Sequence, residues 1–525
     1  MPYDKWKDAS TELDNVCRTR GRCGWNKLQE LLLRPCAQPR EEFLCLRRTT
    51  ALLSAHGLGN EARRILESHA TGAQWSGSPD RKLLHAAYDA ARCALSLRTV
   101  DRETVVDPDT VHWKTLEPYT WASNVRLEAA VRAHRHSDVL SALRARNERN
   151  RREPIATTPF EQGEQRMILG RHFLLRGHLA RSIGYFSAAY RAYSADNSRD
   201  TILAAAKASG NIGIVALYQG QLDHGKELIT NALRTMNGDG CSPEELPFRI
   251  ELAWMSARRG EFDEAGEQAI GIVRDLERLD HSDPVRRQFR LSALLGAAHF
   301  AVAQGNDNEA TSLRDQAERT SSENQSPIIE ANLRVITGRI HGLGSSETSY
   351  RYALAEFDAA RRCYESVGDG FLFGLYKVAI YAGHLHIKHA DVEGALREAL
   401  RCLDFARDRK FLPAASAGLL LKSQLLLQQR GASIVDRLYE DVLRSLHSIH
   451  NPRVLFRVIA NLYLHSWNRR GDLDLTAHHL EQIHKMKEFL DSSSYDLMYE
   501  RYVAKPILSR TLAGNFGHTP IEVAE

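Results

Sequence analysis

One feature most limits the folds open to this 525-residue chain. A glycine or alanine recurs about every 40 residues, each time between two segments whose apolar residues have the spacing of an amphipathic helix. The stretch 169–193, LGRHFLLRGHLARSIGYFSAAYRAY, shows it first, with Gly177 between two helical patterns. Equivalent positions follow at Gly220, Gly260, Gly305, Ala390, Gly431 and Gly471. The spacings are 43, 40, 45, 85, 41 and 40 residues, and the longest covers two units, one with HGLGSSETS at its turn. Because a tight chain reversal favours glycine, the pattern predicts repeated helical hairpins.

Small residues also occur inside each predicted hairpin. In the first unit Gly170 and Ser182 would let the two helix axes approach, and Phe186 would fill the space one turn further on. One hairpin cannot bury its apolar face alone, so neighbouring hairpins must stack. The sequence therefore predicts an all-α fold, an α-solenoid of about eight hairpins with a period of 40–45 residues.

The pattern resembles the tetratricopeptide repeat. The matching residues of the first unit are Leu169, Gly170, Phe173, Gly177, Leu179, Ser182, Phe186 and Ala189. Those of the second are Ile212, Gly213, Gly220, Leu222, Gly225, Ile229 and Ala232. With units longer than the usual 34 residues, the chain is similar to the long-helix variety found in kinesin light chains and in the sensor regions of some bacterial regulators. The resemblance implies a right-handed superhelix, although Ser182 and Gly225 stand where the family has alanine.

Three regions are predicted along the chain. Residues 1–160 look helical but do not fit the repeat, and we interpret them as a cap or a partner-binding module. Residues 161–506 form the predicted solenoid. Residues 507–525 are small and polar and are interpreted as a tail.

Signatures of catalysis and of nucleotide or metal binding are missing from the sequence. There is no GxxxxGK[ST], no GxGxxG after a strand, no GxSxG and no HExxH. Histidines gather at 134–136, 384–389 and 478–484, but no group has the ligand number and spacing of a zinc site. The eight cysteines are sparse and form no CxxC pair, which favours reduced, packed thiols. We therefore predict a protein that is not an enzyme and has no cofactor or metal.

Net charge and hydropathy bear on which class of partner the protein binds, and they exclude less than the missing motifs do. A net charge of +4 is small for this length and argues against a dedicated nucleic-acid binder. A basic run is nevertheless present, made of Arg144, Arg146, Arg149, Arg151 and Arg152. It is interpreted as a solvated helix end, with a phosphate contact or a dock for an acidic partner as alternatives. No secretory signal and no apolar run of membrane-spanning length is apparent, so we expect a cytoplasmic location and no membrane partner.

The resemblance implies that the first helix of each hairpin lines the concave side of the solenoid. On that register the predicted partner-binding groove contains Arg171, Lys207, Trp254, His299, His384, Asn461, His465 and Asn468. This polar, aromatic and partly basic set suits an extended or helical peptide of acidic character. We predict an adaptor or scaffold, a subunit of a bacterial multi-protein system. The alternatives are a signal-responsive regulator that changes shape on binding, and a nucleic-acid-associated subunit using residues 1–160. Homo-oligomerisation stays open.

Overall fold

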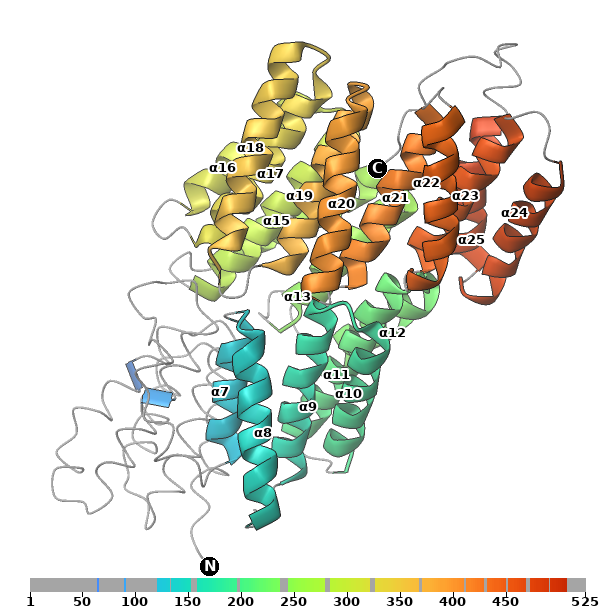
Figure 1. Ribbon diagram of the computed structural model, residues 1–525. Helices are drawn as coiled ribbons and strands as arrows, with labels where there is room; N and C mark the ends of the chain where they lie inside the picture. Colours follow the sequence, from blue (N-terminus) through green and yellow to red (C-terminus); the bar gives the residue numbers. More distant parts are fainter. Residues whose placement is uncertain are drawn as a thin grey trace, which may run out of the picture.

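A computed structural model shows the arrangement of the helices (Figure 1). The residues it describes are 64–65, 89–90, 120–132, 134–152, 158–195, 199–236, 244–278, 284–321, 326–367, 371–409, 412–428, 432–449, 452–468, 473–490 and 492–507. Most of the predicted N-terminal module and the tail after residue 507 lie outside these ranges.

Within these ranges the chain is a succession of antiparallel helical hairpins, as the sequence predicts. Eight hairpins follow one another: α9 (Pro159–Leu175) with α10 (Leu179–Tyr193), α11 (Arg199–Tyr218) with α12 (Leu222–Met236), α13 (Leu246–Arg259) with α14 (Phe262–Glu277), α15 (Pro284–Ala303) with α16 (Asp307–Ser321), α17 (Pro327–Leu343) with α18 (Glu347–Glu365), α19 (Leu372–Lys388) with α20 (Val392–Arg409), α21 (Leu412–Gln428) with α22 (Ala432–Ser445), and α23 (Pro452–Asn468) with α24 (Leu473–Lys485). The chain continues into α25 (Ser492–Tyr499) and a π-helical turn at Glu500–Ala504. The predicted all-α solenoid of about eight hairpins is confirmed.

The turns explain the spacing of the small residues. Gly177, Gly220, Gly260 and Gly305 have φ values of 73°, 86°, 87° and 76°, and Ala390 takes the same left-handed conformation at 57°. These values lie where a Cβ is unfavourable, so glycine is the residue of choice there. Gly431 and Gly471 lie outside the described residues.

The unit without a glycine anchor uses a different turn. Helix α17 ends at Leu343, and Ser346 caps α18 by accepting a hydrogen bond from the Ser349 amide at 3.1 Å. The segment HGLGSSETS is thus the turn of an ordinary hairpin, closed by a side-chain cap in place of a left-handed residue.

Close approach of paired helices explains the other small residues. The Phe186 ring packs directly on Gly170, where an added Cβ would lie 2.5 Å from Cδ1 of that ring. The Ser182 hydroxyl donates to the Gly170 carbonyl at 2.8 Å, which satisfies a polar group that the contact buries. In the next hairpin a Cβ on Gly213 would lie 2.9 Å from the Gly225 carbonyl oxygen. The small residues mark the points where backbones meet.

A further hairpin precedes the eight. Helices α7 (Thr120–Arg132) and α8 (His136–Arg152) pair with each other, and α7 packs against α9. Val139 is completely buried in the core that they share with Ile168. At least this part of the predicted N-terminal module is therefore continuous with the packing of the solenoid.

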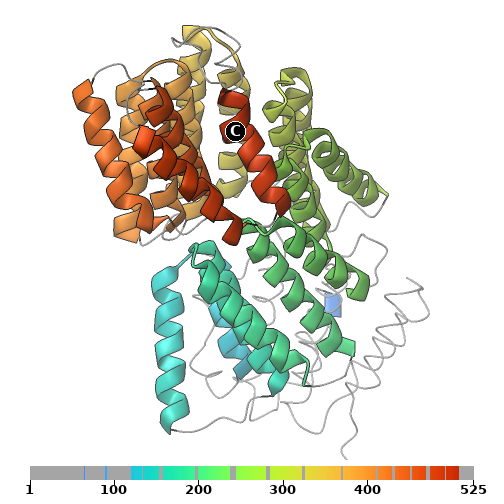
Figure 2. The ribbon, with the colours of Figure 1, turned by 90° about the vertical axis from the view of Figure 1, so that its right-hand side faces the viewer.

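The array curls until its two ends touch. The turn at Gly177 in the first hairpin lies against Pro413 of α21, and the turn at Gly220 lies against Leu490 after α24. Arg453 of α23 donates to the Arg258 carbonyl of α13 at 2.9 Å. The side view shows the last helices returning toward the middle of the chain (Figure 2). Hairpins far apart in the sequence thus lie in contact.

One described helix is long and apolar enough to cross a membrane. The window is Thr201–Tyr218 of α11, with a mean hydropathy of 1.3. Just over half of it, 56%, is buried, and α11 packs between α10 and α12. A core helix of this kind passes the same test, so the window is weak evidence for a membrane span.

Candidate functional site on the inner face of the solenoid

The first helices of four successive hairpins bring polar and aromatic side chains together on the inner face of the curl. We call this set the inner cluster. Its members are Glu251, Trp254 and Arg258 of α13, His299 of α15, Arg339 of α17, and Lys377 and Tyr381 of α19.

Aromatic rings hold the inner cluster together. Trp254 lies 5.8 Å from the His299 ring between centroids, and the Lys377 ammonium lies over the Trp254 ring at 5.5 Å. The Arg339 guanidinium lies over the Tyr381 ring at 4.7 Å. Lys377 belongs to the sixth hairpin and Trp254 to the third, so their contact spans the interior. Cation–π contacts of this kind stabilise a charge without neutralising it.

His299 is held in its neutral form. It is 9% exposed, and its Nδ1 lies 2.6 Å from Nη1 of Arg339, which also contacts the His299 carbonyl oxygen at 3.3 Å. Since a guanidinium only donates, Nδ1 must be the acceptor. Burial, followed by the charges of Arg339 and Lys377, holds the pKa of His299 well below its usual value.

Positive charge exceeds negative charge in the inner cluster. Glu251 is the acidic member of the cluster, and its carboxylate forms an ion pair with Arg258 at 3.5 Å. Both side chains keep about a fifth of their surface exposed, at 21% and 22%. Burial lowers the pKa of Lys377, and Arg258 and Arg339 lower it further while Glu251 opposes them. Glu251 also raises the pKa of Tyr218, on α11, to about 12.

Two cationic groups in the inner cluster lack a good partner among the described residues. The Lys377 ammonium makes no hydrogen bond or ion pair with them; it has only the ring of Trp254 beneath it. Nη1 of Arg258 is buried without a hydrogen-bond partner. Unpartnered cationic groups at a concave surface are suited to an incoming anion.

Two of the eight predicted groove residues, Trp254 and His299, belong to the inner cluster. His384 lies three residues after Tyr381 on α19 and is partly buried. Arg171 instead forms an ion pair with Glu128 of α7 at 3.2 Å, and Lys207 pairs with Glu244.

The remaining predicted groove residues lie in the last two hairpins. Asn461 donates to the Ser423 hydroxyl at 2.9 Å, and Nδ1 of His465 lies 3.2 Å from the Leu426 carbonyl oxygen. Asn468 is the last residue of α23. These contacts join α23 to α21, away from the inner cluster.

The predicted basic run forms the C-terminal half of α8. Arg144 is exposed, and Arg146 donates to the Asn124 side chain of α7 at 3.0 Å. The side chains of Arg149, Arg151 and Arg152 lie outside the described residues. Arg146 therefore has a structural contact, and nothing described assigns a ligand to the run.

Sequence reasoning missed Arg258, Arg339, Lys377 and Tyr381. Arg339 follows His299 by 40 residues, which is one repeat period, but the turn of its hairpin has no left-handed glycine and so supplied no anchor for a groove residue. Counting periods through that unit would have found it.

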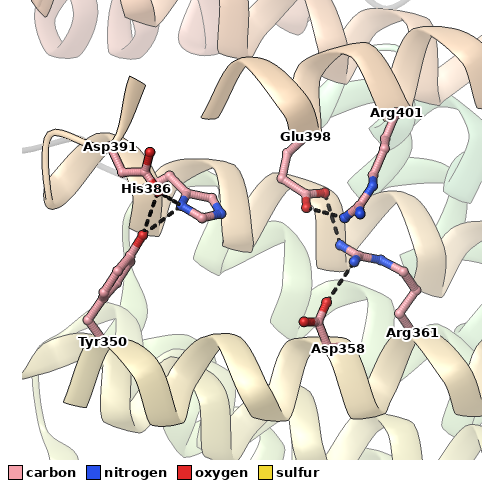
Figure 3. A network of polar contacts seen from close by, with 7 residues as sticks. All are labelled: Tyr350, Asp358, Arg361, His386, Asp391, Glu398 and Arg401. Atoms are coloured by element: carbon pink, nitrogen blue, oxygen red, sulfur yellow. Dashed lines mark hydrogen bonds and ion pairs between the residues drawn. The ribbon is translucent and has the colours of Figure 1, made fainter. Parts of the chain in front are cut away.

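The grouped histidines have structural partners, and no group of three His, Cys, Asp or Glu in the described ranges could hold a metal ion. His386 of α19 and Tyr350 of α18 both contact Asp391, which lies in the turn after α19 (Figure 3). His479 contacts the Tyr439 hydroxyl at 2.6 Å, and His136 contacts Nε2 of His172 at 2.9 Å.

Comparison with known proteins gives similarity in structure alone. No family model and no curated protein matches the sequence. NprR in complex with its peptide NprX has 11% identity and a TM-score of 0.47, with 77% of this chain and 98% of that chain covered. The apo form of RapI has 10% identity and a TM-score of 0.41, with 53% and 94% covered. Yeast Tom70 has 12% identity and a TM-score of 0.41, with 97% and 99% covered.

With identities of 10–12% and TM-scores below 0.5, these similarities carry no conclusion about the function of this chain. Its hairpins have the left-handed turns, the small residues at helix crossings and the continuous stacking that the sequence predicts. By its architecture the chain is a tetratricopeptide-like helical-repeat protein.

Proposed function

We propose that this protein is a non-enzymatic adaptor or scaffold that binds a peptide segment of a partner protein on the inner face of its solenoid. The observation that carries the proposal is the inner cluster. Its aromatic and cationic side chains come from four different hairpins and meet on the inner face. Among the described residues the Lys377 ammonium has no ion pair, and Nη1 of Arg258 has no hydrogen-bond acceptor. Aromatic rings and arginine are the side chains that interfaces favour.

Site-specific photo-crosslinking tests this proposal. A photoreactive phenylalanine analogue replaces Trp254 in the full-length chain, which is irradiated in extract of its host and analysed by mass spectrometry. The matched control places the same analogue at Tyr352, which is 60% exposed on α18. We expect one peptide segment to be cross-linked at 254 and not at 352. Equal products at both positions, or none at 254, would contradict the proposal.

A signal-responsive regulator is a second candidate, and one observation favours it. The turns of the first hairpins contact the last hairpins, with Gly177 against Pro413 and Gly220 against Leu490. A ligand that enters the curl has to act on these contacts, because small shifts at each hairpin interface add along a solenoid. Energy transfer between dyes at exposed positions 190 and 489 would report opening. If the distance between the dyes does not change when the cross-linked partner binds, the regulator is contradicted and a scaffold of fixed shape is supported.

A further inference from the structure

Three histidines lie where the first described hairpins contact the sixth. His134 is in the turn between α7 and α8, His136 is the first residue of α8, and His172 is in the last turn of α9. All three line a small pocket whose other wall is the start of α19, with Phe371 and Phe373. We call this contact the histidine joint. It connects parts of the chain that are far apart in sequence.

The contacts in the histidine joint favour neutral imidazoles. The His134 ring meets the Phe371 ring edge-on, with centroids 4.9 Å apart. Nδ1 of His136 lies 2.9 Å from Nε2 of His172, and this hydrogen bond needs one nitrogen without a proton. The two ring centroids are 4.7 Å apart, so positive charges on both rings would repel. His172 is 5% exposed, so its charge would also be kept from water.

The charged groups around the joint do not compensate for added protons. The pocket lining includes Arg135 and Arg176, and it contains no acidic residue among those that the structure describes. Asp138 of α8 is exposed and forms an ion pair with Arg135 at 3.9 Å. The residues that α7 and α19 contribute to the lining are apolar. Protons taken up by the histidines would therefore add positive charge to a pocket that already has two guanidinium groups.

Burial in the joint keeps two of the histidines neutral. It lowers the pKa of His134 from 6.5 to about 4. Burial, followed by the charge of His136, lowers the pKa of His172 to about 3, and Arg176 and His178 act in the same direction. A ring that leaves the joint regains its ordinary pKa, so the separated state binds protons more tightly than the closed state. Below pH 6.5 proton uptake therefore favours separation.

The backbone at His134 gives a second reason to assign the ring a role. Its φ is 56°, the left-handed conformation that the next hairpins give to Gly177 and Gly220. A Cβ is unfavourable there, so the turn alone would favour glycine. The contact with Phe371 is what a histidine adds at this position.

We propose that the histidine joint is a pH-sensitive contact, which holds the hairpins of α7 to α10 against the sixth hairpin at neutral pH and releases them in acid. Protonation of the three rings places charge in a positive, partly apolar pocket, and separation returns that charge to water. The joint acts whether or not a peptide occupies the inner cluster. It therefore adds a chemical signal to the protein that the proposed scaffold does not include.

The test uses the full-length chain with donor and acceptor dyes on unnatural amino acids at exposed positions 140 of α8 and 400 of α20. Energy transfer and far-UV circular dichroism are both measured from pH 7.5 to pH 5. The variants are His134→Gln and His172→Gln, alone and combined, because glutamine keeps hydrogen-bonding groups but takes up no proton. His134→Gly, which suits the left-handed turn, is a second variant at that position. The control is His224→Gln, exposed on α12.

We expect wild type and His224→Gln to lose energy transfer as the pH falls, with their helix content kept. Between pH 7 and pH 5, His134 and His172 should each shift the ratio of closed to open chains about twentyfold, given their pKa values in the closed and open states. Each single variant should reduce the pH response by about that factor, and His134→Gly should behave like His134→Gln. The double variant should keep most of its energy transfer at pH 5.

Constant energy transfer in wild type down to pH 5 would overturn the proposal, and so would an equal loss in wild type and the double variant. A loss of helix content together with energy transfer, alike in both chains, would show acid unfolding of the whole chain and overturn it too. None of these outcomes bears on peptide binding, which the cross-link at position 254 tests separately.

Discussion

Two groups of polar side chains differ in charge balance: the inner cluster and a second group that we call the outer side. The outer side contains the seven residues drawn in Figure 3. Its larger part joins α18 to α20 with two cations and two anions, Arg361, Arg401, Asp358 and Glu398. Its other part is formed by Tyr350, His386 and Asp391. In the inner cluster Arg258, Arg339 and Lys377 carry positive charge, and Glu251 is its acidic member. The outer distances are 2.6–2.9 Å, whereas the one inner ion pair spans 3.5 Å. The difference separates a group whose charges all form close ion pairs from one in which the Lys377 ammonium has none among the described residues.

The largest expected effect comes from unbalancing the outer network. Glu398 is 4% exposed and accepts from Arg361 at 2.9 Å and from Arg401 at 2.6 Å. Glu398→Gln leaves a buried guanidinium short of one anion and should lower the free energy of unfolding by about 3 kcal/mol. Urea denaturation measures it. The exposed pair of Arg351 and Glu347 supplies the control, since Arg351→Ala should cost less than about 0.5 kcal/mol. An equal loss of unfolding free energy in Glu398→Gln and Arg351→Ala would show that the outer network contributes no more to stability than an exposed ion pair.

A smaller loss is expected from the other part of the outer side. The Tyr350 hydroxyl donates to Oδ2 of Asp391 at 2.8 Å and lies 2.8 Å from Nδ1 of His386. Tyr350→Phe should lower the free energy of unfolding by about 1.5 kcal/mol, because the ring keeps its packing while the hydrogen bonds are lost. Peptide binding should not change. Urea denaturation measures the loss in the free energy of unfolding, and fluorescence anisotropy measures peptide binding. A change in peptide binding would show that the outer side and the inner cluster are coupled.

The inner cluster should respond in the opposite direction. Lys377→Met keeps the stem that packs near Trp254 and removes a charge that has no ion pair. We expect the free energy of unfolding to rise by about 1 kcal/mol while peptide binding to the inner cluster weakens. Lys226→Met, at an exposed position on α12, is the control for the change of residue type. A stability loss larger than that of the control would mean that Lys377 serves the fold.

The smallest effect is a pH dependence that separates the two clusters. His299 has a lowered pKa in the folded chain, so below pH 6.5 the unfolded chain binds a proton that the folded chain does not. Stability is therefore fully present above pH 6.5 and declines as the pH falls below it. The pKa of Asp391 is lowered by the Gly394 amide, so the outer side loses stability only below about pH 3.8.

Chemical denaturation at pH 7 and at pH 5 measures this inner contribution. Other buried histidines add to it, among them His172, whose pKa burial lowers to about 3. His299→Gln should therefore reduce the change in stability between the two pH values without abolishing it. An unchanged difference would show that His299 does not titrate on unfolding in this range.

Local rules explain why the fold could be predicted in such detail. A left-handed turn needs a residue like Gly177, and a close crossing needs one like Gly170, so both leave a mark in the sequence wherever they occur. The hairpin with the Ser346 cap was the one whose turn lacked that mark, because a side-chain hydrogen bond replaced the glycine. Because this hairpin had no glycine anchor to align it with the others, Arg339 was not among the predicted groove residues.

The candidate site could be predicted only in part. Trp254 and His299 stand at neighbouring repeat positions, so the period was enough to group them. Lys377 of the sixth hairpin contacts Trp254 of the third hairpin. A contact between residues so far apart in sequence cannot be predicted from a pattern within one repeat. The sequence also could not place His465. Its repeat position assigns it to the groove, but in the structure its ring contacts the Leu426 carbonyl oxygen of α21.

The sequence by itself therefore determined the repeating unit, its helices and its small-residue contacts, because each depends on residues within one period. Tertiary structure alone decided how tightly the array curls, which first helices face each other, and where charge is left in surplus. These depend on small rotations between neighbouring hairpins that accumulate along the chain, and a rotation set by packing at every interface cannot be read from any one repeat.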